Sequence, residues 1–269
     1  MPEDRLLRIE SNHSLGGGYF LLTLASERSL PPWRAGQFAM LSLGERRDPL
    51  LRRPFSIYNL HDPDESLRHL QFLVKVLGRG TAMLAEARPG DRLSCLFPLG
   101  RGFAPPDREG RRLLLVAGGV GVASLHPLAA AEARARRAPL LLFGCRSAEE
   151  IVAAEPTAAL GIETRLSTDD GSAGFHGFVS DLLDSVLRAG CGAPPLVCAC
   201  GPTAMMKATA EVARRHGAPC WLSLESTMAC GFGICVGCVV AVRRGEDGGA
   251  SYVRTCIEGP VMNAEEVLW

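Results

Sequence analysis

The residues of this chain best suited to chemistry are four cysteines near its C-terminus. Cys230, Cys235 and Cys238 follow the spacing C-x4-C-x2-C, and Cys256 stands a short distance downstream. Plant-type ferredoxins use this spacing to hold two irons through four thiolates. Glycines between the cysteines lack a Cβ atom, so the backbone can curl closely around a cluster. The spacing therefore predicts a [2Fe-2S] cluster and, with it, one-electron chemistry.

Two other uses of these cysteines stay open at this point. A structural zinc ion usually takes its thiolates from two separated C-x2-C pairs, whereas this chain has one such pair after an x4 gap. Disulfides are typical of oxidising compartments. The first residues, MPEDRLLRIE, lack the apolar segment of a signal peptide. We therefore expect a cytoplasmic setting, in which the other cysteines are core or site thiols.

A second group of candidate residues lies in the N-terminal half. Arg52 and Arg53 precede a Pro-Phe-Ser segment, where an arginine could neutralise a diphosphate and the serine could hydrogen-bond a flavin ring. Adjacent arginines are also common as solvent-facing charge, so that interpretation stays open. Downstream, KVLGRGT at 75–81 places glycines before a predicted helix, a position that suits phosphate.

A third group follows apolar runs of the central region. Parallel sheets bind ligands at the carboxyl ends of their strands. The glycine turn at 118–121 follows such a run and could offer backbone N–H groups to a phosphate, although similar turns also serve packing alone. Asp169 and Asp170 follow a predicted strand at 163–166. A carboxylate there could bind a ribose 2′-OH and favour NAD over NADP, and a surface turn is the alternative.

The elements that must position these residues change character along the chain. Up to residue 104, short and often alternating strands with one helix over 81–87 predict an antiparallel barrel. From 105 to 222, apolar strands alternate with helices, including helices over 148–160, 179–187 and 203–216, which predicts a parallel sheet covered on both faces. Residues 223–269 hold the cysteines and two short strands. We therefore predict a multi-domain α+β chain with a Greek-key flavin-binding barrel (1–104), an α/β nucleotide-binding domain (105–222) and a small [2Fe-2S] domain (223–269).

Composition argues against several classes of partner. The chain has 269 residues, and Lys+Arg and Asp+Glu both total 29, so its formal net charge is zero. No basic field is available to attract nucleic acid or anionic lipid. The most apolar run, 113–125, is broken by glycines and too short to span a bilayer. We expect neither nucleic acid nor a membrane as a partner.

Taken together, the motifs resemble those of a known family. Arg-Pro-Phe-Ser at 53–56, Gly-x-Gly-Thr at 78–81, the glycine turn and Cys-Gly-Pro at 200–202 occur in the order typical of the ferredoxin–NADP reductase superfamily. Within it, the chain is similar to the electron transfer subunits of type-B, NAD-dependent dihydroorotate dehydrogenases. That similarity lies in LLRRPFSI, KVLGRGT, PLGRGF, AGGVGVA, STDDGS, CGPTAMMKA, SLESTMACGFGICVGC and YVRTCIEGPVMNAEEVLW, which together are spread over nearly the whole chain.

The resemblance implies a role for each matching position. FAD would be held by Arg53, Pro54, Phe55, Ser56, Leu73, Val74, Lys75, Gly80 and Thr81. The NAD site would be bordered by Gly118, Gly119, Gly121, Asp169, Gly201 and Pro202. Cys200 would lie near the nicotinamide, with simple packing as the alternative. Cys230, Cys235, Cys238 and Cys256 would ligate the [2Fe-2S] cluster.

The function that the resemblance implies is an electron conduit in pyrimidine biosynthesis. A catalytic partner would oxidise dihydroorotate on its FMN, and single electrons would pass through the cluster to FAD and then, as hydride, to NAD+. A heterotetramer with two copies of each subunit is expected. Two rivals stay open: a diaphorase subunit of a sulfite reductase, a hydrogenase or a bifurcating ferredoxin–NADP reductase, and a non-catalytic zinc-binding module on a reductase scaffold.

Overall fold

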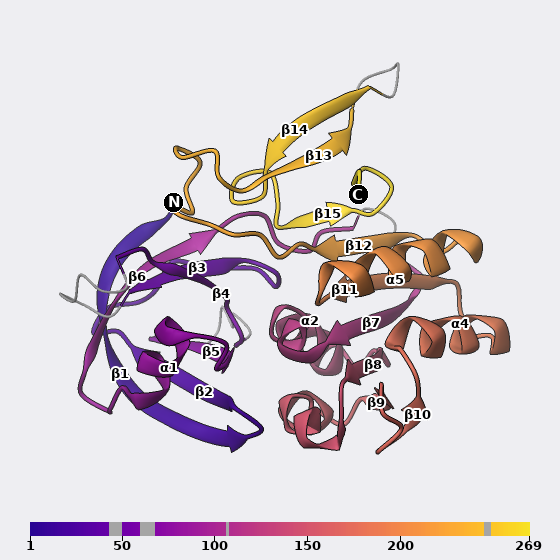
Figure 1. Cartoon of the computed structure of the whole chain (residues 1–269), viewed down its shortest axis with the longest axis horizontal. Coiled ribbons are helices and arrows are strands. Elements are labelled where there is room, and N and C mark those ends of the chain that lie inside the picture. The colour runs from indigo at the N-terminus through magenta and orange to yellow at the C-terminus, as the bar shows by residue number, and fades with distance from the viewer. Residues whose placement is uncertain (43–49, 60–67, 106–107, 245–248) are drawn as a thin grey trace.

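The structure is a computed structural model that describes residues 1–42, 50–59, 68–105, 108–244 and 249–269. Two large sheets lie side by side, and a two-stranded hairpin lies above them (Figure 1). In the part of the chain described, no helix is long and apolar enough to cross a membrane.

The first sheet is the predicted antiparallel barrel. Its six strands run in the order β4-β3-β6-β1-β2-β5, and every pairing is antiparallel. The strand β4 also lies against β5, so the sheet nearly closes on itself. The elements are β1 (Glu3–Gly16), β2 (Tyr19–Ala25), β3 (Phe38–Ser42), β4 (Arg53–Ser56), β5 (His69–Lys75), α1 (Arg79–Glu86) and β6 (Arg92–Leu99).

The second sheet has the order β10-β9-β8-β7-β11-β12-β15, and its strands are parallel except for β15. Its strands are β7 (Arg112–Gly118), β8 (Leu140–Cys145), β9 (Glu163–Thr168), β10 (Phe175–His176), β11 (Pro195–Cys200), β12 (Cys220–Ser223) and β15 (Val261–Asn263). The strand β8 is buried along its whole length and β7 from Leu113 onward, which explains the apolar sequences of these segments. The strand order reverses between β7 and β11, which places a ligand-binding crevice at their carboxyl ends.

Helices cover both faces of this sheet. The helices α4 (Val179–Ala189) and α5 (Thr203–Arg215) pack on one face. The helix α2 (Val122–Arg134) packs on the other face, and a one-turn 3-10 helix, η1 (Gly119–Gly121), precedes it. Amphipathic sequences explain this arrangement, since α4 buries Val179, Leu182, Leu183 and Val186 against the strands.

The C-terminal segment is shared between two substructures. The hairpin β13 (Val239–Arg243) and β14 (Ala250–Arg254) stands apart as its own sheet. By contrast, β15 pairs antiparallel with β12 and so extends the parallel sheet. The division of the chain at residues 104 and 222 stays a prediction.

Several predicted elements differ from those observed. The prediction of one helix over 148–160 is wrong. The segment forms a 3-10 helix, η2 (Ala148–Ala153), followed by a one-turn α-helix, α3 (Glu155–Ala158). Pro156 explains the break, because proline has no N–H to donate within a helix. The two short strands β10 and β15 were not predicted at all, because two or three residues carry no periodicity. Residues 106–107 of the predicted linker lie outside the described residues.

Candidate functional site

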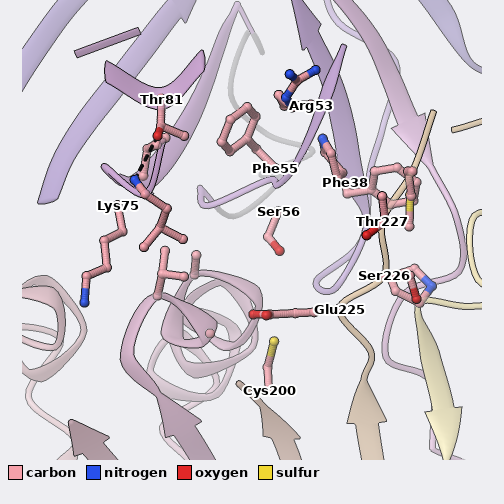
Figure 2. A pocket seen from close by; sticks show the side chains of 18 of the residues that line it. Phe38, Arg53, Phe55, Ser56, Lys75, Thr81, Cys200, Glu225, Ser226 and Thr227 are labelled. Carbon is pink, nitrogen blue, oxygen red and sulfur yellow. Dashed lines mark hydrogen bonds between the residues drawn. The ribbon is translucent and has the colours of Figure 1, made fainter. Parts of the chain in front are cut away.

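A cleft of about 720 Å³ lies between the barrel and the carboxyl edge of the parallel sheet (Figure 2). Its walls come from three parts of the chain: the barrel, the turns after β7 and β11, and the segment after β12. The lining residues that the sequence predicted are Arg53, Pro54, Phe55, Ser56, Leu73, Val74, Lys75, Gly80, Thr81, Gly121 and Cys200. Leu77, Gly78, Arg79 and Val120 also line the cleft and belong to the predicted motifs at 75–81 and 118–121. The lining residues that the sequence did not predict are Phe38, Ala123, Thr203, Ser223, Leu224, Glu225, Ser226, Thr227, Met228 and Pro260.

The barrel wall of the cleft separates the two adjacent arginines. Arg52 turns away from the cleft and pairs with Asp4 at 2.7 Å and with the Ser94 hydroxyl at 2.8 Å. Arg53 lines the cleft, and its guanidinium donates to the backbone carbonyl of Leu51. One arginine therefore supports the barrel, and the other, which begins β4, can face a ligand.

The same wall carries the start of a helix. The chain leaves β5, crosses the cleft at Leu77–Thr81 and begins α1 at Arg79. The Thr81 hydroxyl accepts from the backbone N–H groups of Leu77 (2.9 Å) and Gly78 (3.1 Å) and donates to the Gly78 carbonyl (2.9 Å). Thr81 therefore braces the turn, while the first backbone N–H groups of α1 are suited to an anion.

Glycines let the turns after β7 and β11 approach each other closely. A Cβ atom on Gly121 would collide with the backbone carbonyl of Cys200, and one on Gly118 would lie 2.5 Å from the Met205 sulfur. Gly201, at φ 155°, packs against the Cα atom of Gly118. Gly121 and Cys200 reach the cleft lining, whereas Gly118, Gly119, Gly201 and Pro202 lie outside it, and Gly118 packs between Met205, Pro202 and Gly201. These glycines are therefore needed for packing at the point where the strand order reverses.

Cys200 sits in a small polar group at the base of the cleft. Its side chain is buried, and this burial, followed by the charge of the nearby Glu225 carboxyl, raises the pKa of the thiol to about 12, although hydrogen bonds with Ser223 and Ser124 act in the opposite direction. The Ser124 hydroxyl donates to the Ser223 hydroxyl at 2.8 Å. Cys200 and Glu225 face each other across the cleft floor (Figure 2). A thiol with a raised pKa stays protonated at neutral pH, so this side chain is suited to packing and hydrogen bonding rather than to nucleophilic attack.

Glu225 is the most informative residue that the sequence analysis missed. It opens onto the cleft, yet protein surrounds its carboxyl group closely enough that burial raises its pKa above the ordinary 4.5. Its position follows β12, whose carboxyl end lies at the same edge as those of β7 and β11. The signal was available, because the rule that ligands meet the carboxyl ends of parallel strands applies to β12 as well.

Asp169 and Asp170 lie outside the cleft, exposed at the end of β9. Asp170 accepts from the Ser172 backbone N–H at 2.9 Å and from its hydroxyl at 2.5 Å, and these hydrogen bonds lower the pKa of its carboxyl. Asp170 therefore holds the turn. The backbone N–H of Asp169 donates to the Cys145 carbonyl at 3.0 Å, which places its side chain near the end of β8.

The four predicted cluster ligands lie on one loop and at the base of the β13–β14 hairpin, as two neighbouring pairs. Thr255 donates twice to the Cys238 carbonyl, from its backbone N–H at 3.0 Å and its hydroxyl at 3.1 Å. This pairing places Cys256 beside Cys238. The backbone N–H of Cys235 approaches the Cys230 sulfur at 3.5 Å.

The donor set suits an iron–sulfur cluster. Burial opposes ionisation of the Cys230 thiol, but the backbone N–H groups of Cys235, Phe232 and Ile234 outweigh it and lower its pKa to about 6. Gly231, Gly233 and Val236 adopt left-handed backbone conformations, as a loop curling around a cluster requires. Among the described residues, no three His, Cys, Asp or Glu side chains form a ready-made metal site. The fit therefore rests on the chemistry of the loop, four thiols and converging N–H groups.

Solved structures share the fold of this chain. A chain of the NADH-dependent reduced ferredoxin–NADP oxidoreductase, studied for flavin-based electron bifurcation, matches with 30% identity and a TM-score of 0.82, covering 98% of this chain and 90% of that one. The ferredoxin–NADP+ reductase of Neisseria gonorrhoeae, solved with FAD and NADP, matches in fold alone, with 20% identity and a TM-score of 0.65 over 80% of this chain and 92% of that one. The fold is that of the ferredoxin reductase class, as predicted.

Comparison with sequence relatives identifies the family, within the ferredoxin reductase class, to which this chain belongs. Residues 225–268 match the iron–sulfur cluster binding domain of dihydroorotate dehydrogenase B. The electron transfer subunit of dihydroorotate dehydrogenase B (NAD(+)) from Desulforamulus reducens is 37% identical, covering 87% of this chain and 86% of that protein. The corresponding subunit from Geobacillus thermodenitrificans is 36% identical, with 97% of each covered. This chain belongs to the family of dihydroorotate dehydrogenase B electron transfer subunits, which confirms the predicted resemblance.

Proposed function

We propose that this chain is the electron transfer subunit of an NAD-dependent dihydroorotate dehydrogenase. It passes electrons from a catalytic partner subunit through an iron–sulfur cluster and FAD to NAD+. The observation that carries this proposal is the identity of 36% with a named subunit of this kind over 97% of both chains. One cleft between a barrel and a nucleotide-type sheet, with a cysteine loop beside it, supports the same conclusion.

FAD fits the barrel side of the cleft. Arg53 and the start of α1 offer positive charge and N–H groups to a diphosphate, and Ser56 and β5 (Leu73, Val74) supply a polar edge and an apolar wall for a flat ring. Bound flavin exchanges electrons singly or in pairs, which links a one-electron cluster to a two-electron nicotinamide. The protein would hold the flavin ring and the nicotinamide ring in a fixed relative position and exclude water from the cleft floor.

The nicotinamide nucleotide is proposed to enter from the opposite wall. The turns after β7 and β11 form that wall, where Gly121 and Cys200 line the cleft and Gly118, Gly119, Gly201 and Pro202 belong to the same two turns. Cys200 stays neutral and orients the ring by contact rather than by proton transfer. Asp169 is proposed to meet the ribose at the sheet edge and to disfavour a 2′-phosphate.

The cluster is proposed to bind at Cys230, Cys235, Cys238 and Cys256, and the partner to approach from the outer side of this loop. Cys235 is exposed, and the neighbouring Phe232, Ile234 and Val236 leave 47%, 75% and 60% of their surfaces open. Exposed apolar side chains of this kind commonly mark a protein interface. We further propose that the partner carries FMN and that two copies of each subunit assemble.

Co-purification with a dihydroorotate-oxidising partner tests this function. The complex should reduce NAD+ in the presence of dihydroorotate, and the chain alone should oxidise NADH with an artificial acceptor. Cys235→Ser should abolish dihydroorotate-dependent NAD+ reduction while the NADH–acceptor activity persists. A full dihydroorotate-dependent rate in Cys235→Ser, or a colourless protein that holds zinc, would refute the proposal.

A second candidate is a diaphorase subunit of a bifurcating ferredoxin–NADP oxidoreductase. The match of 30% identity and TM-score 0.82 to such an enzyme favours it. The two functions differ in the partner, because only the first requires a subunit that oxidises dihydroorotate. Isolation of the native complex and identification of its second subunit therefore decides between them.

A further inference from the structure

The cysteine loop has two distinct sides. Cys238 and Cys256 are buried, with 4% and 1% of their surfaces exposed, whereas Cys235 is exposed and Cys230 is half-buried. The inner pair is held by the base of the hairpin, where Thr255 anchors the Cys238 backbone. A cluster bound by all four thiolates would therefore have an outer face toward solvent and an inner face toward the protein.

The inner face rests on a small apolar group that is separate from the barrel core. Cys238 and Cys256 pack with Phe38, Met40, Leu99 and Met228. The strand β3 explains the separation: Ala39 and Leu41 point into the barrel core, while Phe38 and Met40 point the other way, toward the cysteine loop. A Cβ atom on Gly231 would collide with the Met40 side chain, so the loop backbone lies directly on it.

This apolar group also reaches the cleft. Phe38 and Met228 both line the cleft. Phe38 lies beside Thr227 (Figure 2). Met40 pairs across the sheet with Pro54, and Phe38 pairs with Ser56, so both lie next to the strand proposed to hold the flavin. Through direct packing, three side chains thus connect the two buried cysteines to the flavin side of the cleft.

We propose that Phe38, Met40 and Met228 form the contact through which single electrons cross between the cluster and the flavin, on the side of Cys238 and Cys256. Each crossing removes one electron from the cluster and adds one to the flavin, and no bond is made or broken. A dense apolar contact suits this step, because it holds the two centres close and keeps water, whose reorganisation opposes charge movement, out of the gap. This inference rests on the proposed function and adds to it the path that electrons take between the cluster and the flavin.

The first test uses the metal-free protein and thiol labelling. Under native conditions iodoacetamide should modify the outer pair, Cys230 and Cys235, while Cys238 and Cys256 stay protected. Met40→Ala should speed labelling of Cys238 and Cys256 about tenfold and leave Cys235 unchanged. If Cys238 and Cys256 react as fast as Cys235 in the unmodified sequence, the two-sided loop is wrong and the proposal fails.

The second test follows electrons in the protein loaded with flavin and cluster. After rapid mixing with NADH, flavin reduction in Met40→Ala and Met228→Ala should match the wild type, while the following reduction of the cluster slows about tenfold, seen by absorbance and electron paramagnetic resonance. Met40→Leu, which keeps an apolar side chain of similar size, should restore the rate. Val253→Ala, which opens a cavity in the same hairpin on its other side, is the matched control.

The outcomes separate the route from the function. Cluster reduction at the wild-type rate in both alanine variants would overturn the route, even where dihydroorotate-dependent activity persists. An equal slowing in Val253→Ala would also overturn it, because the effect would then come from loosening of the hairpin. Failure of NADH to reduce the flavin at all would instead refute the proposed function.

Discussion

The Lys75 ammonium lies 2.6 Å from Glu150 Oε2, and this ion pair ties the barrel strand β5 to the 3-10 helix η2 beside the parallel sheet. The Tyr19 hydroxyl donates to the same carboxylate oxygen at 3.2 Å, and the ammonium lies 4.9 Å from the centre of the Tyr19 ring. Burial, followed by the charge of Glu150, raises the pKa of Tyr19, so its hydroxyl remains a donor. Since Lys75 also lines the cleft, the pair helps to fix how far apart the two cleft walls stand.

Replacing Glu150 by Gln should loosen this junction. The glutamine oxygen can still accept from Tyr19, but the Lys75 ammonium, only 21% exposed, loses its counter-charge. We expect a loss of about 1–2 kcal/mol in the free energy of unfolding, measured on the flavin-free protein by urea titration. Glu211→Gln removes an exposed pair with Arg214 on α5 and serves as the control, with an expected change within about 0.5 kcal/mol. Equal losses in both variants would contradict a specific role for the junction.

Replacing Gly121 by Ala should disturb the floor of the cleft. The new Cβ atom would meet the backbone carbonyl of Cys200, which cannot move without shifting the turn after β11. Overpacking of this kind costs about 1–3 kcal/mol, and we expect thermal unfolding at a lower temperature together with a raised KM for NADH. Gly249→Ala, where no atom lies within 4 Å of the new Cβ, is the matched control. An unchanged KM in Gly121→Ala would show that the turn has room to adjust.

Much of the fold could be predicted because its signals are local. The alternation around Phe72 and Val74 and the unbroken apolar run of β7 depend on which faces are buried, and both appear directly in the sequence. The segment Ala148–Ala158 was mispredicted because its composition favours helix while Pro156 and packing against the barrel hairpin decide its shape. The strand β15 depends on a partner far away in sequence, β12, and no local pattern specifies it.

The candidate site was predictable to the extent that its motifs carry backbone constraints. Arg53–Ser56 and the glycine turns have compositions that few other structures need, so the sequence indicated them. Glu225 and Met228 reach the cleft because β12 ends at its edge, so only their position after that strand, and not their residue types, could have indicated a role. Likewise, Arg53 begins β4 and lines the cleft, whereas Arg52 just before the strand turns to Asp4 and Ser94, and this difference became visible only with those two partners in place.

Glu225 should make the protein's stability depend on pH. Burial raises its pKa in the folded state above the ordinary 4.5, so the folded protein holds this proton more tightly than the unfolded chain does. The contribution of this carboxyl group to the free energy of unfolding is therefore fully present below pH 4.5 and is lost as pH rises through the raised pKa. Relative to the wild type, Glu225→Gln should become progressively more stable as pH rises through this window, as measured by urea titration at several pH values. A stability difference that does not vary with pH would contradict this assignment.

Asp169 and Asp170 should contribute unequally to the choice between NADH and NADPH. Asp170 is engaged with Ser172 in its own turn, whereas the Asp169 carboxylate stands exposed at the end of β9. Asp169→Asn should therefore lower the ratio of kcat/KM for NADH over NADPH about tenfold, or ~1.4 kcal/mol, by removing repulsion of the 2′-phosphate. Asp170→Asn, the matched control, should weaken the turn and leave this ratio nearly unchanged. Because both changes remove one negative charge from the same turn, an equal shift in the two variants would mean that only the general charge of this edge matters, and that Asp169 does not contact the ribose.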